Sequence, residues 1–211
     1  YVGATVIEPK KGFYIDPVAT LDYKSLYPSI MIAGNLGPST LVEPRYDGKP
    51  CRASRGVKTR TWNVTDTYAT TFVQNEKGKN HFGKIPSMLK RLLAARDAVK
   101  VHMKTAYKRG DKFQGGMLNS KQLAIKISCN SVYGFFGVKV GRGFFPINAI
   151  AATVTCWGRA IITGLTKQRI EEEKGWECIY GDSVTGDTPI FIRLRGAPGH
   201  AGTRSCSSFL A

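Results

Sequence analysis

The chain begins with short β-type patterns that lead into a helix. In residues 18–23, VATLDY, apolar and polar positions alternate, which predicts a strand with Asp22 at its end. In the next stretch, SLYPSIMIAGNL, Ser25 is a candidate N-cap and Pro28 falls in the first turn, which predicts a helix that GNLGPST ends. Residues 41–85 mix Thr, Gly and short β-prone runs. They therefore predict loops and short strands.

Two long helical patterns follow, joined by the polar stretch RGDKFQGG. The first, PSMLKRLLAARDAVKVHMKTAYK, starts at Pro86 and carries apolar residues on one face at helical spacing. These are Leu92, Ala95, Val99, Met103 and Ala106. Basic residues run beside them four apart, namely Arg96, Lys100, Lys104 and Lys108. The second, NSKQLAIKISCNSVYGFFG, has Asn119 or Ser120 as its candidate cap, and the short connection predicts an antiparallel helical hairpin.

A third helix and an acidic strand complete the regular pattern. After the glycine-rich connector GVKVGRGFFP, residues 147–175 read as one long helix ended by Gly175. WECIYGD then predicts a strand whose tip carries Asp182, whereas GAPGHAGTRSCSSFLA has no periodicity and predicts disorder or truncated structure. The pattern predicts no apolar run long enough to cross a membrane. The predicted fold class is α+β, an antiparallel sheet backed by helices with a projecting two-helix hairpin.

The net charge indicates the kind of binding partner, and the cysteine content indicates the redox state of the compartment. The 211 residues carry a formal net charge of +16, which favours nucleic acid as a partner ahead of an anionic membrane. A plain solubility surplus is the alternative. The five cysteines are odd in number and form no CxxC pair, which favours a reducing, intracellular compartment. The opening YVGATVIEPKK has neither Met nor a signal pattern, so we expect a piece of a longer protein.

Two groups of residues could carry chemistry. Gln122, Lys126 and Asn130 lie four apart on one helix face with Tyr133 close by, a pattern that suits a phosphate-bearing ligand with a flat ring. Arg96 could add a planar fork for the same phosphates. For Lys126 alone, a solvated helix face is the simpler interpretation.

The second group is a pair of aspartates at strand ends. If the strands of Asp22 and Asp182 are neighbours, their carboxylates supply what a two-metal phosphoryl-transfer site needs, with magnesium as the preferred ion. Alone, Asp22 would more often be a solvated strand end.

The motifs in order resemble those of the family B DNA polymerases. DYKSLYPSIM (residues 22–31) is similar to motif A, KISCNSVYG (126–134) to motif B, and YGD (180–182) to the start of motif C. EPKKGFY, LLAAR and VTCWGR also fit, so the resemblance covers residues 1–182. Within the family, the motifs most resemble those of replicative polymerases from eukaryotes and their large DNA viruses. The resemblance implies template-directed DNA synthesis with two Mg²⁺ ions, from dNTPs on primer–template DNA. It also implies an intracellular location, in the nucleus or cytoplasm of a host cell if the protein is viral. A sliding clamp is a further implied partner, through regions outside these residues, and a membrane is not.

The resemblance also implies roles for single residues. Asp22 and Asp182 would bind metal, and the backbone N–H groups of Ser25 and Leu26 would lie under the triphosphate. Tyr27 would be the steric gate against ribose. The triphosphate would be held by Arg96, Lys126 and Asn130, with Tyr133 near the nascent base pair. Residues 1–85 and 138–182 would be palm, residues 86–137 fingers, and residues 183–211 the start of an intein or a truncated tail.

The chain departs from the family within motif C. The family pattern is Tyr-Gly-Asp-Thr-Asp-Ser, but Val184 stands where the second Asp belongs, and Asp187 is out of place. A frameshift or chimaeric end, a natural inactive variant and an intein are the three explanations. We favour the intein because SVTGDTPIFIRLRG resembles an intein's opening block, with Ser183 as nucleophile toward the carbonyl of Asp182. His200 lacks the surroundings of the intein histidine.

Two rival functions remain open at this point. A non-catalytic nucleic-acid-binding module would use the basic residues and not the aspartates. An RNA-synthesising polymerase is the second rival, and Tyr27 argues against it. No proofreading exonuclease or thumb is visible in the 211 residues, so activity of this piece alone is not expected.

Overall fold

The computed structural model describes residues 3–47, 56–75, 81–138, 147–182 and 188–194. The chain divides into two compact units, one formed by Tyr1–Gly3 and Tyr27–Cys156, the other by Ala4–Leu26 and Trp157–Ala211. Antiparallel sheets and helices make up both, so the predicted α+β class is confirmed. The palm and fingers boundaries are functional assignments, and they stay predictions.

The first unit contains a small antiparallel sheet and the helix that follows motif A. β3 (Leu41–Arg45), β5 (Ala69–Val73) and β4 (Thr59–Asn63) pair in that order, within the region expected to hold short strands. α1 (Leu26–Ala33) buries Tyr27, Ile30 and Met31. Just after it, the buried Asn35 donates from Nδ2 to the carbonyls of Val73 and His81, and its Oδ1 accepts from the Gly83 N–H, each at 2.8 Å. One amide thus ties the end of α1 to β5 and to the start of the next helix.

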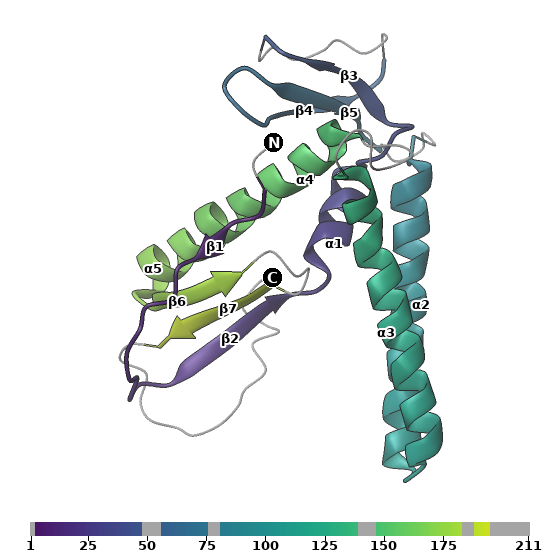
Figure 1. The fold of residues 1–211 in the computed structure, drawn as a ribbon, viewed down its shortest axis with the longest axis vertical. Helices are drawn as coiled ribbons and strands as arrows, with labels where there is room; N and C mark the ends of the chain where they lie inside the picture. The colour runs from purple at the N-terminus through teal and green to yellow at the C-terminus, as the bar shows by residue number, and fades with distance from the viewer. Residues whose placement is uncertain (1–2, 48–55, 76–80, 139–146, 183–187, 195–211) are drawn as a thin grey trace. The chain divides into compact units, whose positions relative to one another are not determined.

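The predicted helical hairpin is present as α2 (Lys84–Lys108) and α3 (Lys112–Phe136), which lie side by side in Figure 1. The prediction of its second cap is wrong, because Asn119 and Ser120 lie inside α3. The cap is Asp111, whose carboxylate accepts from the Gln114 N–H at 2.9 Å. Much of the stretch read as connector is therefore helix. The glycine pair that suggested a loop is accommodated because Gly115 packs directly against the ring of Tyr107.

The buried face of α2 also differs from the predicted one. Val99 and Ala106 are buried as expected, together with Pro86 and Leu89, but Ala95 is exposed. Arg96, expected on the basic flank, is only 7 % exposed. The sequence pattern treats a charged residue as solvent-facing, whereas here a long side chain packs between two helices and finds a polar partner there.

The third predicted helix consists of three successive segments. α4 (Asn148–Arg159) is followed by the π-helical η1 (Ala160–Lys167) and by α5 (Gln168–Lys174), which ends at Gly175 with a left-handed φ of 63°. In the part of the chain that the structure describes, this Asn148–Lys174 stretch is long and apolar enough to span a membrane, contrary to our expectation. It is 56 % buried over its most apolar window, which is typical of a core helix.

The second unit is built on a four-stranded antiparallel sheet in the order β1-β6-β7-β2. Its strands are β1 (Val6–Ile7), β2 (Val18–Tyr23), β6 (Glu177–Asp182) and β7 (Thr188–Arg193). β2 and β6 match the two predicted strands, and β7 is formed by the β-type run that follows motif C. The buried side chains of Cys178, Ile190 and Ile192 form its apolar face.

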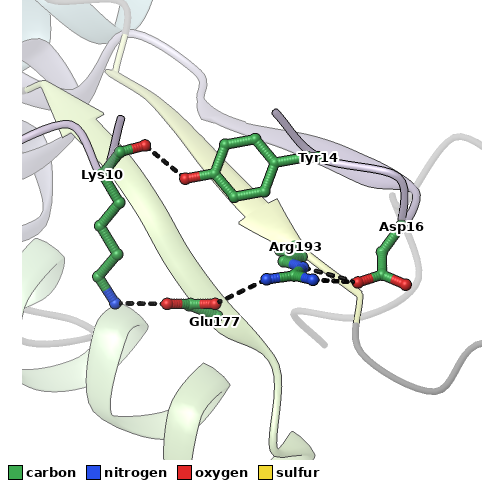
Figure 2. A network of polar contacts seen from close by, with 5 residues as sticks. All are labelled: Lys10, Tyr14, Asp16, Glu177 and Arg193. Carbon is green, nitrogen blue, oxygen red and sulfur yellow. Dashed lines mark hydrogen bonds and ion pairs between the residues drawn. The ribbon is translucent and has the colours of Figure 1, made fainter. Parts of the chain in front are cut away.

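A surface network fastens the segment before β2 to this sheet (Figure 2). Arg193 pairs with Asp16 at 2.6 Å and with Glu177 at 3.6 Å, and Lys10 donates to Glu177 at 2.9 Å. The hydrogen bond from Lys10 to Glu177 raises the pKa of that lysine. The Tyr14 hydroxyl donates to the Lys10 carbonyl. These contacts link β6 and β7 to the chain that leads into Asp22.

Several predictions concern residues outside the described ranges. They are the junction serine Ser183, the substituted position Val184, the displaced Asp187, His200 and the expected disorder of residues 195–211. Most of the glycine-rich connector, residues 139–146, also lies outside them.

Candidate active site

The two strand-end aspartates belong to the same sheet. Asp22 is exposed near the end of β2, and its Cα is in register with Pro189 of β7. Asp182 is the last residue of β6, whose preceding Gly181 is in register with Ile190. Extending that register by one residue brings Asp182 level with Pro189, so Asp22 and Asp182 lie at the same end of the sheet. The prediction that their strands are neighbours is wrong, because β7 lies between β6 and β2. Two strand spacings put the Cα atoms of Asp22 and Asp182 about 10 Å apart.

The chain turns sharply between β2 and α1. Ser25 has a φ of 50°, in the left-handed region that residues other than Gly seldom adopt. It is therefore not an ordinary N-cap, which keeps an extended backbone. Ser25 and Leu26 are 3 % and 2 % exposed, so their backbone is fixed by the surrounding protein. A non-Gly residue held in this conformation is a feature that often marks functional sites.

Tyr27 and Tyr133 form an aromatic pair within the first unit. Their ring centroids are 4.5 Å apart with a tilt of 36°, and Tyr27 is only 4 % exposed. The contact joins α1 to the C-terminal half of α3. The motif A tyrosine therefore packs against the motif B tyrosine, although the two are far apart in the sequence.

The polar face of α3 lies against Arg96 of α2. Arg96 Nε donates to Gln122 Oε1 at 3.2 Å, and Gln122 Nε2 donates to Asn119 Oδ1 at 3.0 Å. Lys126 and Asn130, one and two turns further along α3, are half-buried. Asn130 Oδ1 is buried and accepts no hydrogen bond from any residue that the structure describes. Buried polar atoms without a partner are rare. An amide oxygen only accepts, so a contact of Asn130 with phosphate would use its Nδ2 and not this atom.

The buried thiol of Cys129 lies near this arginine. Burial raises the pKa of the Cys129 thiol, and the positive charge of Arg96 opposes that change. A raised pKa keeps Cys129 a neutral thiol in the core.

Gln122 is the residue whose part we did not anticipate. The sequence places it on the face of Lys126, but nothing in the pattern shows that its amide meets Arg96. Two signals could have indicated the contact. Gln122 lies four residues before Lys126, and Arg96 begins the row of basic residues four apart on the preceding helix.

The donor set for a metal ion consists of two carboxylates. Among the described residues, no group of three or more His, Cys, Asp or Glu side chains is placed to hold an ion. A pair of aspartates at one sheet end fits magnesium, which prefers oxygen ligands and takes the rest from water and substrate phosphates.

Comparison with known proteins identifies the family. A model of DNA polymerase family B matches residues 1–192, and the chain belongs to this family. It is 42 % identical over 192 residues to the DNA polymerase delta catalytic subunit of Drosophila melanogaster, covering 87 % of this chain and 16 % of that protein. It is 39 % identical over 196 residues to the DNA polymerase of Paramecium bursaria Chlorella virus NY2A, covering 92 % and 20 %.

A solved structure gives the same answer for the fold. The family B DNA polymerase of the hyperthermophilic archaeon Pyrobaculum calidifontis is 32 % identical with a TM-score of 0.63, covering 93 % of this chain and 23 % of that one. The chain therefore spans about a fifth or less of its curated relatives. The stretches that resemble motifs A and B and the start of motif C all lie within the residues that the family model matches.

Proposed function

We propose that the full-length protein containing these residues is a template-directed DNA polymerase that adds dNTPs to a primer 3′ end. The observation that carries the proposal is the register of the four-stranded sheet, in which Asp22 and Asp182 reach the same end. Membership of family B supports the same activity. Phosphoryl transfer requires mainly positioning and charge stabilisation, and the residues described above are suited to both.

Asp22 and Asp182 are proposed to hold two Mg²⁺ ions. Bound magnesium would neutralise charge on the triphosphate and stabilise the charge that develops during nucleotidyl transfer. Asp22 suits this role because its carboxylate is exposed at a strand end. The family's second motif C aspartate is not present at Val184, so the completed protein must supply that carboxylate.

The nucleotide is proposed to be bound by residues of both motifs A and B. Arg96, Lys126 and Asn130 bind the triphosphate, and Ser25 and Leu26 contribute backbone N–H groups. Tyr27 rejects ribose, because its ring is buried against Tyr133 and cannot easily move away from a 2′-hydroxyl. Tyr133 lies near the nascent base pair. Residues 86–137 act as the fingers and residues 1–85 and 138–182 as the palm.

Partners and location follow from the same proposal. The net charge of +16 suits primer–template DNA. A sliding clamp would bind through parts of the protein outside these residues. The site of action is intracellular, in the nucleus or in the cytoplasm of a host cell if the protein is viral.

Primer extension by the full-length protein tests the function. We expect extension only with the dNTP complementary to the template, its loss on chelation of divalent ions and its recovery with Mg²⁺. Lys126→Met should raise the KM for dNTP at least about tenfold, because a charge-assisted contact to phosphate is lost. DNA binding without any extension would instead support the non-catalytic nucleic-acid-binding module.

We further propose that an intein begins at Ser183 and interrupts motif C. The support is the sequence SVTGDTP, residues 183–189, which joins a hydroxyl nucleophile to a Gly-Asp-Thr run directly after YGD. The Ser183 hydroxyl would attack the Asp182 carbonyl, so that an ester replaces the amide and the amine of Ser183 is released. The competing account assigns these residues to the polymerase itself, since the family match extends to residue 192 and β7 pairs with β2.

Mass analysis of the full-length gene product separates these accounts. The intein predicts a polymerase shorter than its open reading frame, with Asp182 joined to a Thr-Asp-Ser sequence, and Ser183→Ala should leave the unspliced precursor. A product of full length that contains residues 183–211 would contradict the intein.

A further inference from the structure

The amide of Gln122 is held between two hydrogen bonds. Its Oε1 accepts from Arg96 Nε at 3.2 Å, and its Nε2 donates to Asn119 Oδ1 at 3.0 Å. Gln122 and Arg96 are each 7 % exposed, so the first bond lies in the packed region between α2 and α3. The second bond determines which end of the amide faces the arginine, because an amide that donates to Asn119 must turn its oxygen away from it.

This arrangement restricts a side chain that is otherwise very flexible. An arginine side chain has several rotatable bonds and gives up much conformational freedom when it is fixed. A hydrogen bond at Nε fixes the plane of the guanidinium group and thereby the direction of the two terminal nitrogens. A guanidinium that is already oriented loses less entropy when it binds phosphate.

We infer that Gln122 is a positioning residue, which orients Arg96 for the triphosphate of the incoming nucleotide. The inference rests on the proposed role of Arg96 in nucleotide binding. Gln122 would act through Arg96 and without contact to the nucleotide. Asn119 is exposed to solvent and would act indirectly, because its Oδ1 accepts from Gln122 Nε2 and so holds the Gln122 amide in place.

A packing role alone makes a different prediction. If Gln122 only joins α2 to α3, its loss would lower stability and would affect the binding of DNA and of dNTP without regard to Arg96. If it orients Arg96, its loss should matter only while the guanidinium is present. A double-mutant cycle between the two positions measures that dependence.

The experiment uses the full-length polymerase and steady-state primer extension. Gln122→Met removes the hydrogen bonds at similar volume, and we expect the KM for dNTP to rise about five- to tenfold. The kcat and the Kd for primer–template DNA should change less than about twofold, since only uniform nucleotide binding is lost. In an Arg96→Met background the same substitution should have no further effect on KM. Leu123→Met, on the neighbouring exposed position, is the matched control and should change nothing.

Each other result has a definite meaning. If Arg96→Met alone leaves the KM unchanged, the role proposed for Arg96 fails, and the inference fails with it. If Arg96→Met raises the KM but Gln122→Met does not, or if the two effects are additive, only the role of Gln122 is overturned. If Gln122→Met does not fold, Asn119→Ala decides, since it leaves the helix interface intact. A KM raised about twofold supports the inference, and an unchanged KM overturns it.

Discussion

Single residues of this chain combine burial with polar character at the places where ligand binding is proposed. Arg96 is buried with a hydrogen bond from its Nε to Gln122, and Tyr27 is buried with its ring against Tyr133. Asn130 has a buried Oδ1 that no described residue satisfies. Burying such groups costs free energy that tight packing of apolar residues would avoid. The nucleotide contacts proposed for these residues would account for such groups on α1, α2 and α3.

Replacing Tyr27 tests its role as the gate against ribose. Tyr27→Ala in the full-length polymerase should admit ribonucleotides, lowering discrimination between dNTP and rNTP by at least about tenfold because the excluded volume is lost. Tyr27→Phe keeps the ring and should keep the discrimination. The ratio of kcat/KM for matched dNTP and rNTP measures it. Unchanged discrimination in the alanine variant would show that another group performs the selection.

The residues of the candidate site could be predicted from sequence only where a motif names them. Motifs A and B indicated Asp22, Tyr27 and Lys126. The burial of Arg96 could not be predicted, because hydrophobic periodicity assigns every charged residue to the solvent. The Arg96–Gln122 hydrogen bond was equally hidden, because it depends on how far α2 and α3 are shifted along each other.

At the scale of elements, the helical hairpin depends on one close contact near its turn. A Cβ on Gly115 would lie 2.5 Å from the Tyr107 ring, whereas one on the neighbouring Gly116 would meet nothing within 4 Å. Both glycines lie inside α3, where alanine is the better helix former.

The two glycines therefore make a matched pair of variants. Gly116→Ala should raise the free energy of unfolding of the 211-residue chain by about 0.5–1 kcal/mol. Gly115→Ala should gain less or lower it, because the tyrosine ring must move. Urea unfolding followed by helical circular dichroism measures both. Equal stabilisation by the two substitutions would contradict the packing described for Gly115.

A buried hydroxyl pair joins α4 to the small sheet of the first unit. Thr70 and Thr153 are fully buried with their Oγ1 atoms 2.6 Å apart, and Thr153 Oγ1 donates to the Ala149 carbonyl at 2.7 Å. Because that hydrogen is already used, the Thr70 hydroxyl is the donor to Thr153.

Removing each hydroxyl should therefore have unequal effects. Thr153→Val leaves a buried donor without its acceptor and should cost about 2 kcal/mol, whereas Thr70→Val should cost about 1 kcal/mol. The double variant should cost less than the sum. Denaturant unfolding of the four proteins gives the values. A larger cost for Thr70→Val, or strict additivity, would contradict this assignment of donor and acceptor.

Elements with strong local signals were predicted, and those set by distant contacts were not. β2, β6 and the long helices follow from periodicity. The start of α3 was placed too late because Gly115 and Gly116 read as a loop, and only the contact with Tyr107 explains them. The position of β7 between β6 and β2 could not be predicted, because no local pattern specifies which distant strand it joins.

At the scale of the whole molecule, stability should fall at alkaline pH. Burial raises the pKa of the Cys129 and Cys178 thiols above 9.0 and that of Tyr68 above 10.0. The hydrogen bond to Glu177 raises the pKa of Lys10 above 10.5. In each case the unfolded chain loses its proton first as the pH rises. This part of the stability is therefore complete below pH 9.0 and declines above it.

Urea unfolding of the 211-residue chain at pH 8 and pH 10 measures the decline. A variant with both Cys129→Ala and Cys178→Ala should show a shallower decline between these two values, because two of the groups with a raised pKa are gone. Equal stability at both pH values in the parent chain, or a rise, would contradict the effect of burial on these thiols.

The central claim for the molecule is that the aspartates at one end of the four-stranded sheet support metal-dependent DNA synthesis. The most direct measurement is primer extension by the full-length polymerase carrying Asp22→Asn. Asp16→Asn is the matched control, since it makes the same change in the segment before β2 at a residue paired with Arg193. We expect Asp22→Asn to lower kcat at least about 10³-fold with primer–template binding retained, and Asp16→Asn to keep kcat within about twofold. Primer extension at the parent rate by the Asp22→Asn protein would contradict the account.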